Sequence, residues 1–307
     1  MSHLNKLGIN EIIAVDNFTP NKVNNLSGKK IAVKIDRGHF FEKVKPYLPN
    51  IDFIFHLGAK TNTLESSEDL FEKWNTDYSK KIWSLCVENQ ISLIYASSAA
   101  TYGNGELGFS EDEAIISKLR PLNNYARSKN KFDLWIISQK EYPPYWAGLK
   151  FFNVFGPNEY HKGPMASMIY QAFNQIQKNS HVRLFKSYRS GYDDGGQKRD
   201  FIYALDVAEI CTQLMQHHTP DGIINIGTGH SISFNDVVKC IFEELNLSTH
   251  IEYIDMPSVI QANYQYSTQA DLAKLELLPG TKKCIRLPQL VIKDYLSNYL
   301  IPNKLYY

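Results

Sequence analysis

Two residues that could carry out acid/base chemistry, Tyr125 and Lys129, stand four positions apart in the sequence. A helix places residues at this spacing on one face, so the phenol and the ammonium would lie together. A free tyrosine has a pKa of roughly 10, and a neighbouring positive charge favours the phenolate. Ser98, in a serine- and threonine-rich run, could hold a substrate oxygen opposite the phenol. Because this spacing alone usually marks a surface helix, Ser98 is what favours a catalytic site.

Two further cations, Lys162 and Arg199, lie in the second half of the chain. Lys162 follows the Gly156-Pro157 turn and comes just before a predicted helix, which would place it at the mouth of a cleft. Arg199 follows a glycine-rich loop and precedes a predicted strand, and a guanidinium there could bind a diphosphate through two parallel hydrogen bonds. A solvated lysine and a salt bridge between Arg199 and Asp200 are the open alternatives.

The composition excludes several classes of protein. A chain of 307 residues can bury a full core as one large domain or two closely joined ones. The net charge of +1, without a long basic run, disfavours nucleic acid or an acidic membrane as the main partner. Four widely spaced cysteines fit reduced thiols and neither a disulfide scaffold nor a zinc site. With no apolar membrane stretch or signal peptide, the chain is predicted to be soluble and cytoplasmic, without a metal.

Short apolar runs alternate with longer helical patterns in the first half, as in a parallel sheet with right-handed crossovers. Strands are predicted at 11–16, 31–36, 52–56, 91–96, 146–152, 201–203 and 223–227, and helices at 70–88, 124–140, 165–177, from 206, and 234–245. The predicted fold is α/β, a Rossmann-like doubly wound parallel sheet with a smaller, interleaved C-terminal substrate domain. Residues 1–156 would bind a dinucleotide and residues 157–307 mainly the substrate, with 200–230 returning to the sheet.

The start of the predicted sheet departs from the usual order. A dinucleotide-binding sheet opens with a strand, a glycine-rich turn and a helix whose N-terminus receives the pyrophosphate. Here the first residues read as the tail of that helix, ending at Gly8, so the strand at 11–16 would be the second one. Either the natural start lies upstream, which the later functional residues favour, or the chain is a truncated relative. Without that turn we expect weak cofactor binding and poor folding.

Several motifs together resemble one family, the ADP-glyceromanno-heptose 6-epimerases among the extended short-chain dehydrogenase/reductases. The resemblance spans nearly the whole chain and rests on residues 55–59, 95–103, 151–165, 198–203 and 267–272. The segment with His161-Lys162-Gly163 separates this family from UDP-galactose epimerases and sugar dehydratases. Dehydratases also carry acidic residues where this chain has Ala99-Ala100.

The resemblance implies an enzyme that interconverts ADP-D-glycero- and ADP-L-glycero-manno-heptose, the precursor of lipopolysaccharide core heptose. NADP would take a hydride from C6 and return it to the opposite face. Tyr125 and Lys162 would be the two acid/base groups, because the ketone must be reprotonated from both sides. Lys129 would bind the ribose and, with the oxidised nicotinamide, lower the pKa of the phenol, while Ser98 would hold the reacting oxygen. The family also implies a homo-oligomer, a homopentamer.

The same resemblance implies two sets of binding residues. The cofactor set is Asp16, Asn17, Lys22, Leu57, Gly58, Ala59, Lys60, Thr61, Asn75, Lys129, Val154 and Lys162. The substrate set is Ser98, Asn153, Pro164, Gln171, Phe185, Lys186, Ser187, Tyr188, Arg199 and Tyr264. Pro164 and Gln171 stand where the family often has serine and histidine, and the placement of Lys22 depends on a one-residue gap.

Other functions fit some of the same residues. An aspartate at the second strand end, here Asp16, normally favours NAD over NADP, although Asn17 and Lys22 could offset its charge. Another nucleotide-sugar 4-epimerase, a non-catalytic relative and an ordinary alcohol dehydrogenase are the alternatives. An alcohol dehydrogenase would consume its cofactor, whereas an epimerase leaves it unchanged overall.

Overall fold

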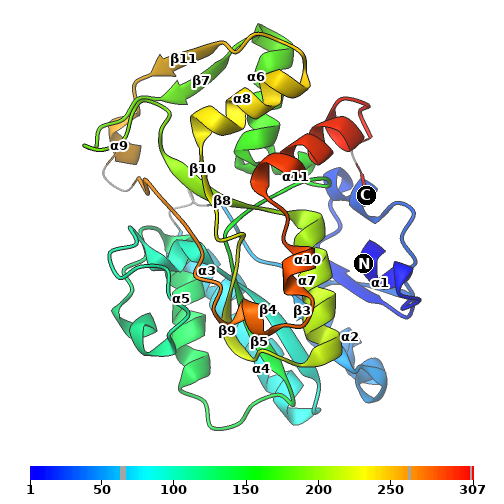
Figure 1. The fold of residues 1–307 in the computed structure, drawn as a ribbon. Coiled ribbons are helices and arrows are strands. Elements are labelled where there is room, and N and C mark those ends of the chain that lie inside the picture. The colour runs from blue at the N-terminus through cyan, green and yellow to red at the C-terminus, as the bar shows by residue number, and fades with distance from the viewer. Residues whose placement is uncertain (63–66, 262–263, 305) are drawn as a thin grey trace.

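The computed structural model describes residues 1–62, 67–261, 264–304 and 306–307. Its main sheet is parallel and runs in the order β3-β4-β5-β9 (Figure 1). The strands are β3 (Phe53–His56), β4 (Ser92–Ser98), β5 (Trp146–Phe151) and β9 (Gly222–Ile226). This sheet, with helices on both faces, is the predicted Rossmann-like α/β fold.

A second parallel pair, β1 (Ile13–Asp16) and β2 (Val33–Asp36), extends the same layer. Among the described strands no pairing joins β1 to β3, so the sheet is in two pieces. Ile13 and Ile35 from the pair pack into one hydrophobic cluster with Ile54 and Leu93 from the main sheet. This shared cluster therefore packs the two pieces of the sheet against each other.

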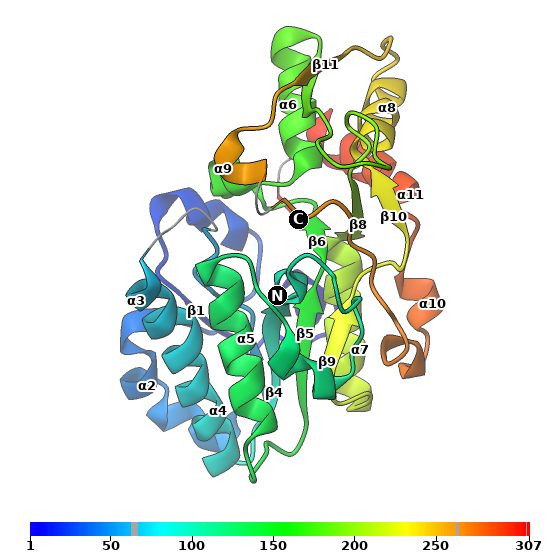
Figure 2. The ribbon, with the colours of Figure 1, turned by 90° about the vertical axis from the view of Figure 1, so that its left-hand side faces the viewer.

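Helices cover both faces of the main sheet (Figure 2). On one face, α4 (Tyr78–Glu88) and α5 (Asn124–Ile137) pack against β4 through the cluster around Trp83, Tyr95 and Phe132. On the other, α7 (Ala204–His217) packs through Ile210 and Leu214 against inward residues of β5 and β9. The predicted helix at 70–88 begins as α3 (Glu68–Phe71) and passes through a π-helical stretch, Glu72–Asp77, before α4.

The upper part of the molecule holds two small sheets. β6 (Asn153–Phe155), β8 (Lys198–Tyr203) and β10 (Ser231–Ser233) form one in the order β10-β8-β6, and β7 (Val182–Phe185) pairs in parallel with β11 (Ile251–Ile254). The chain enters this part through a break at Phe152, which divides the predicted strand 146–152 from β6. It returns to the main sheet at β9, which pairs with β5.

Helices surround these small sheets. They are α6 (Met168–Asn179), α8 (Phe234–Glu244) and α11 (Pro288–Tyr295), with the short α9 (Ser258–Gln261) nearby. The short α1 (Ser2–Lys6), α2 (Phe40–Lys43) and α10 (Thr281–Cys284) lie elsewhere in the fold. α6 begins later than the predicted 165, because Tyr160–Met165 is a 3-10 segment and Ser167 caps the helix by accepting from Tyr170 N at 3.2 Å.

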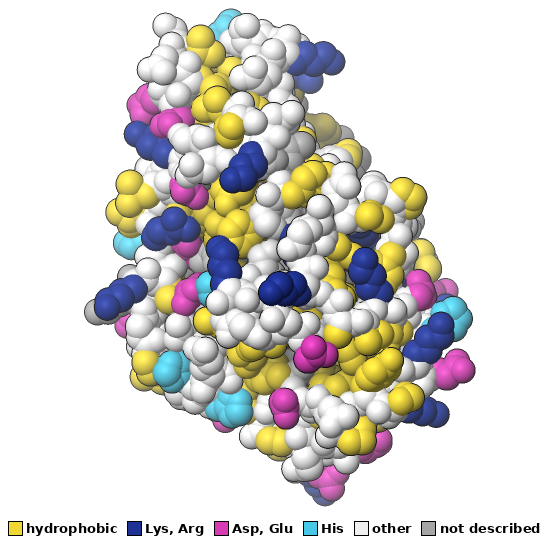
Figure 3. All heavy atoms as spheres, turned by 90° about the vertical axis from the view of Figure 1, so that its right-hand side faces the viewer, with side chains coloured by type: hydrophobic (Ala, Val, Ile, Leu, Met, Phe, Trp, Pro, Cys, Tyr) yellow, Lys and Arg dark blue, Asp and Glu magenta, His cyan; other side chains and the backbone are white. Residues whose placement is uncertain are grey.

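Surface charge is mixed. Figure 3 shows lysine and arginine side chains spread among acidic and apolar ones over one face of the molecule. No helix within the described ranges is long and apolar enough to cross a bilayer.

Candidate functional site

Three of the residues predicted to be catalytic lie together where β4 ends and α5 begins. Asn123 caps α5 by accepting from Ala126 N at 2.9 Å, which places Tyr125 and Lys129 on consecutive turns facing the sheet. Lys129 Nζ is buried and donates to the Ala96 carbonyl at 2.7 Å. Ser98, the last residue of β4, hydrogen-bonds the Tyr125 phenol through its side chain. Ser98 and Tyr125 are thus in direct contact, and Lys129 is anchored to the same strand two residues before Ser98.

Burial dominates the electrostatics of this group. It raises the pKa of the Tyr125 phenol, the Ser98 hydrogen bond lowers that pKa, and the Asp133 carboxylate raises it. Burial lowers the pKa of Lys129 to about 8, and Asp133 raises it. The protein alone therefore shifts the phenol in the opposite direction from the one that the Tyr125–Lys129 spacing predicts. The cause is that removal of phenolate from water is the largest effect.

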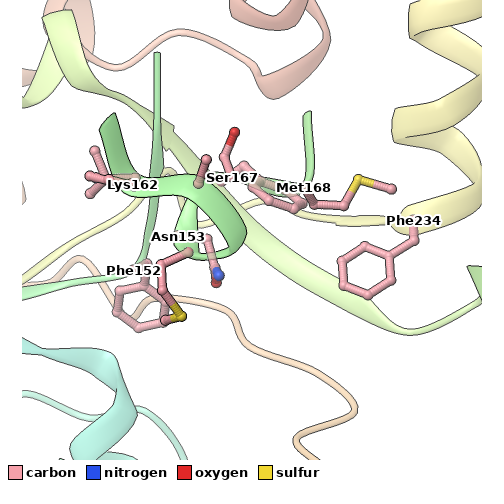
Figure 4. A pocket seen from close by; sticks show the side chains of 10 residues that line it. Phe152, Asn153, Lys162, Ser167, Met168 and Phe234 are labelled. Carbon is pink, nitrogen blue, oxygen red and sulfur yellow. The ribbon is translucent and has the colours of Figure 1, made fainter. Parts of the chain in front are cut away.

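A pocket of about 290 Å³ lies just beyond these strand ends and is lined by Asn153, Val154 and Lys162 (Figure 4). Its other lining residues are Phe152, Met165, Ala166, Ser167, Met168, Phe201 and Phe234. The structure thereby brings three predicted site residues together around one concavity.

Strand register connects the pocket to the serine. Ser98 pairs with Phe151 across β4 and β5, and adjacent strands lie about 4.8 Å apart. Phe152 and Asn153, the next two residues along the chain, already belong to the pocket wall. Ser98, Tyr125 and Lys129 are not part of that lining, so the candidate site consists of two adjoining groups at one end of the sheet.

Lys162 is held in a constrained loop. Gly163 has a φ of +54°, a conformation that suits glycine, and its carbonyl accepts from Gln171 Nε2 at 2.7 Å. Pro164 follows within the same 3-10 segment. Gln171 and Pro164, which depart from the family pattern, therefore shape the backbone next to Lys162.

The same loop is closed by Glu159, a residue that sequence analysis missed. Its buried carboxylate accepts from Ser167 N at 2.5 Å, Ser167 Oγ at 2.8 Å and the Tyr295 hydroxyl at 3.0 Å. No local pattern in the sequence distinguishes Glu159 from a solvated carboxylate, because its partner Tyr295 is 136 residues away.

Part of the predicted cofactor set lies just after the ends of β1 and β3, whereas Val154 and Lys162 line the pocket. Lys22 Nζ lies 3.0 Å from Asp16 Oδ1 and 2.7 Å from Asn17 Oδ1 at the end of β1. Asn75 is buried and binds both the N–H and the carbonyl of Lys60, at 2.8 and 3.0 Å, and its amide also reaches Ser128. Asn75 therefore fixes the loop of residues 57–61 that follows β3 against α5.

These residues fit a dinucleotide. At Gly58 a Cβ atom would meet nothing within 4 Å, so a ligand can approach the backbone there. Asp16, Asn17 and Lys22 offer the acceptors and donors that ribose hydroxyls and phosphates require. The Lys129 ammonium has three N–H groups and gives one to Ala96, which leaves it able to donate to a ribose.

Arg199 occupies a buried aromatic slot in the upper part. Its guanidinium lies 5.5 Å from the Phe234 ring centre and 5.4 Å from that of Tyr264, and burial lowers its pKa. Asp200 does not pair with it, and instead accepts from Thr228 N at 2.7 Å and Ala270 N at 3.0 Å. Arg199 makes no ion pair with a carboxylate in the described part of the chain, so an anionic ligand would supply its counter-charge.

The remaining predicted substrate residues lie beside this slot. Phe185 stands edge-on to Tyr264 at 6.4 Å. Lys186 and Tyr188 both bind Asp255, at 3.1 and 2.8 Å, and Ser187 N donates to Asp194 at 2.7 Å. Hydrogen bonds therefore hold segment 185–188 in place next to Arg199.

Comparison with known proteins gives the family. A model of the NAD dependent epimerase/dehydratase family matches residues 1–227. ADP-L-glycero-D-manno-heptose-6-epimerase from Fusobacterium nucleatum is 41% identical over 97% of this chain and 92% of its own length. The enzyme of that name from Nitratidesulfovibrio vulgaris strain DP4 is 43% identical over 89% and 85%.

Solved structures show the same similarity. The crystal structure of Helicobacter pylori ADP-L-glycero-D-manno-heptose-6-epimerase matches with a TM-score of 0.78 and 25% identity, over 97% of this chain and 90% of that one. A UDP-N-acetylglucosamine 4-epimerase from Methanobrevibacter ruminantium shares the fold, with a TM-score of 0.80 and 23% identity over 98% and 94%. The chain therefore belongs to the NAD dependent epimerase/dehydratase family and, within it, to the ADP-L-glycero-D-manno-heptose-6-epimerases.

Proposed function

We propose that this protein interconverts ADP-D-glycero- and ADP-L-glycero-manno-heptose at C6, with NADP as its cofactor. The observation that carries the proposal is the placement of Lys162 in a pocket whose wall includes Phe152 and Asn153. These two residues directly follow Phe151, the β5 partner of Ser98, and Ser98 hydrogen-bonds the Tyr125 phenol. Two proton-carrying groups, on α5 and on the loop before α6, thus stand at one end of the sheet. The names of the relatives support the substrate.

The chain's own residues supply the proton chemistry in this proposal. A nicotinamide bound at the strand ends would accept a hydride from C6 and return it. Tyr125 exchanges a proton with the sugar oxygen on one face, and Lys162 does so on the other. Ser98 holds that oxygen by a hydrogen bond, and Arg199 binds the diphosphate.

The direct test is to incubate the purified chain with ADP-D-glycero-manno-heptose in heavy water and follow C6 by NMR. The L-epimer is expected without deuterium on C6, because the hydrogen leaves and returns as hydride. Failure to form this epimer would contradict the proposal. If the chain turned over UDP-N-acetylglucosamine and not ADP-heptose, it would be a nucleotide-sugar 4-epimerase. A ketone formed in proportion to the cofactor consumed would indicate a dehydrogenase.

Cofactor choice should depend on Lys22. Its ammonium offsets the Asp16 carboxylate at 3.0 Å, which would otherwise repel a 2′-phosphate. Lys22→Met is expected to weaken NADP binding roughly tenfold, equivalent to about 1.4 kcal/mol, and to leave NAD binding much less affected. Calorimetric titration with each cofactor measures this, and Lys45→Met, at an exposed position, is the matched control. An equal loss for both cofactors would argue against NADP.

We further propose a cytoplasmic homopentamer, on the strength of the family. Light scattering after size-exclusion chromatography measures the assembly. A particle of five chain masses is expected, and a monomer at micromolar concentration would contradict the proposal.

A further inference from the structure

A buried ion pair lies directly beneath the Ser98–Tyr125 group. Lys150 Nζ on β5 is 3.0 Å from Asp133 Oδ2 on α5, and the two side chains are 1% and 0% exposed. Neither residue belongs to the predicted site. α5 lies against β4 and β5, so the pair connects the helix that carries Tyr125 to the sheet that carries Ser98 (Figure 2).

The hydrogen bonds of this pair reach both sides of Ser98. Asp133 accepts from Ser97 Oγ at 2.7 Å and from the Tyr95 hydroxyl at 3.0 Å, both on β4 before Ser98. Lys150 Nζ donates to Thr101 Oγ1 at 2.6 Å, and that hydroxyl donates to the Ser98 carbonyl at 2.8 Å. The strand before Ser98 and the turn after it are therefore fixed to one ion pair.

The pair also sets the position of α5. Tyr125, Lys129 and Asp133 follow each other at four-residue intervals, so they share one face of the helix. Lys129 binds the Ala96 carbonyl and Asp133 binds Ser97, which anchors two successive turns of α5 to consecutive residues of β4. A sliding or rotation of the helix would break both contacts.

A glycine on β5 leaves room for the Tyr95 side chain. Gly148 pairs with Tyr95 across β4 and β5, and a Cβ atom at Gly148 would lie 2.2 Å from the Tyr95 hydroxyl oxygen. The glycine thus admits the phenol that reaches Asp133.

Stability alone does not account for a buried ion pair. Desolvating two charges offsets most of their attraction, and well-packed apolar replacements are often as stable or more so. We propose that Asp133 and Lys150 are positioning residues, which set the distance and orientation of the Ser98 hydroxyl relative to the Tyr125 phenol. The inference deepens the proposed function, because it concerns the geometry of the same reaction.

The main test removes both charges at once. Asp133→Leu/Lys150→Met leaves the buried Ser97 and Tyr95 hydroxyls without their acceptor, so it is expected to melt at a lower temperature than the unaltered chain. Assayed where circular dichroism shows that it is folded, its kcat for heptose epimerisation is expected to fall roughly 100-fold with KM little changed, as misplaced reacting groups produce. The single variant Lys150→Arg should retain most of the kcat of the unaltered chain, because a guanidinium can bind Asp133 and Thr101 together. Unaltered kcat in the double variant, or a rise in KM alone, would overturn the proposal.

A second arm does not depend on activity. Thr101→Val keeps the ion pair but removes the link from Lys150 to the Ser98 carbonyl. 3-Fluorotyrosine is placed at position 125, and its ¹⁹F chemical shift is compared with that of the chain without a further substitution. The shift is expected to change in Thr101→Val and to stay the same in Lys150→Arg. An unmoved resonance in Thr101→Val would refute the positioning role.

The control pair is Arg286 and Asp206, 2.5 Å apart on the other side of the fold, where Arg286 lies over Tyr203. Arg286→Met/Asp206→Leu should leave both kcat and the fluorine resonance unchanged. If the unaltered chain does not epimerise ADP-heptose, the proposed function fails, and the fluorine arm still decides whether the network positions Ser98.

Discussion

Tyr125→Phe and Lys162→Met are each expected to lower kcat for C6 epimerisation by roughly 10²–10⁴-fold, the usual contribution of a positioned acid or base. The reason is that each group serves one face of the sugar carbon, so the remaining group cannot complete the inversion. Substrate binding should change much less, because Arg199 and the segment 185–188 remain in place. Steady-state kinetics with ADP-heptose measure both parameters.

A sharper consequence separates the two roles. In single turnovers with each pure epimer, Tyr125→Phe should fail to reduce the cofactor with one epimer, and Lys162→Met with the other. Lys131→Met is the control, because this lysine is on α5 but points outward to Glu68 and Glu72 at 3.1 and 3.0 Å. Inversion at full rate in either active-site variant, or the same epimer preference in both, would contradict the two-group mechanism.

Local patterns predicted the elements that carry Tyr125 and Ser98. Alternation of apolar runs and helical spacing predicted that the main sheet is parallel, and the observed β4 and α5 lie within a few residues of the prediction. The second half was harder to predict because its strands are short: β6 and β10 have three residues each, too few to show a period. Gly163 and Pro164 also delay the start of α6.

Long-range contacts explain what the sequence did not reveal at the site. Asp133 meets Ser97 across 36 positions of the chain, and Glu159 meets Tyr295 across 136. The shift in the pKa of Tyr125 also depends on burial, which the spacing to Lys129 cannot show. Three of the residues that sequence analysis missed, Asp133, Lys150 and Glu159, are buried charges whose partners come from other elements.

Glu159→Ala is expected to destabilise the fold by roughly 3–5 kcal/mol. The buried carboxylate accepts from the partly buried Ser167 N and Ser167 Oγ and from the buried Tyr295 hydroxyl. A buried donor left without a partner costs about 1–3 kcal/mol, and the two Ser167 donors lose their acceptor in the same variant. Urea unfolding followed by circular dichroism measures the change in the free energy of unfolding. Glu141→Ala, at an exposed position, should be close to neutral.

Glu159→Gln tests whether it is the carboxylate that closes the Lys162 loop. Each oxygen of Glu159 accepts from a backbone N–H group, Oε2 from Ser167 N at 2.5 Å and Oε1 from Gly156 N at 3.4 Å. In either orientation the glutamine NH₂ group therefore faces one N–H group that cannot accept, although the Ser167 and Tyr295 hydroxyls can turn to accept from it. An intermediate loss of stability is therefore expected, together with a lower kcat under conditions where the variant is fully folded, because Lys162 lies between Glu159 and Ser167 in the same loop. If Glu159→Ala and Glu159→Gln had the same urea midpoint of unfolding as Glu141→Ala, other contacts would hold this loop.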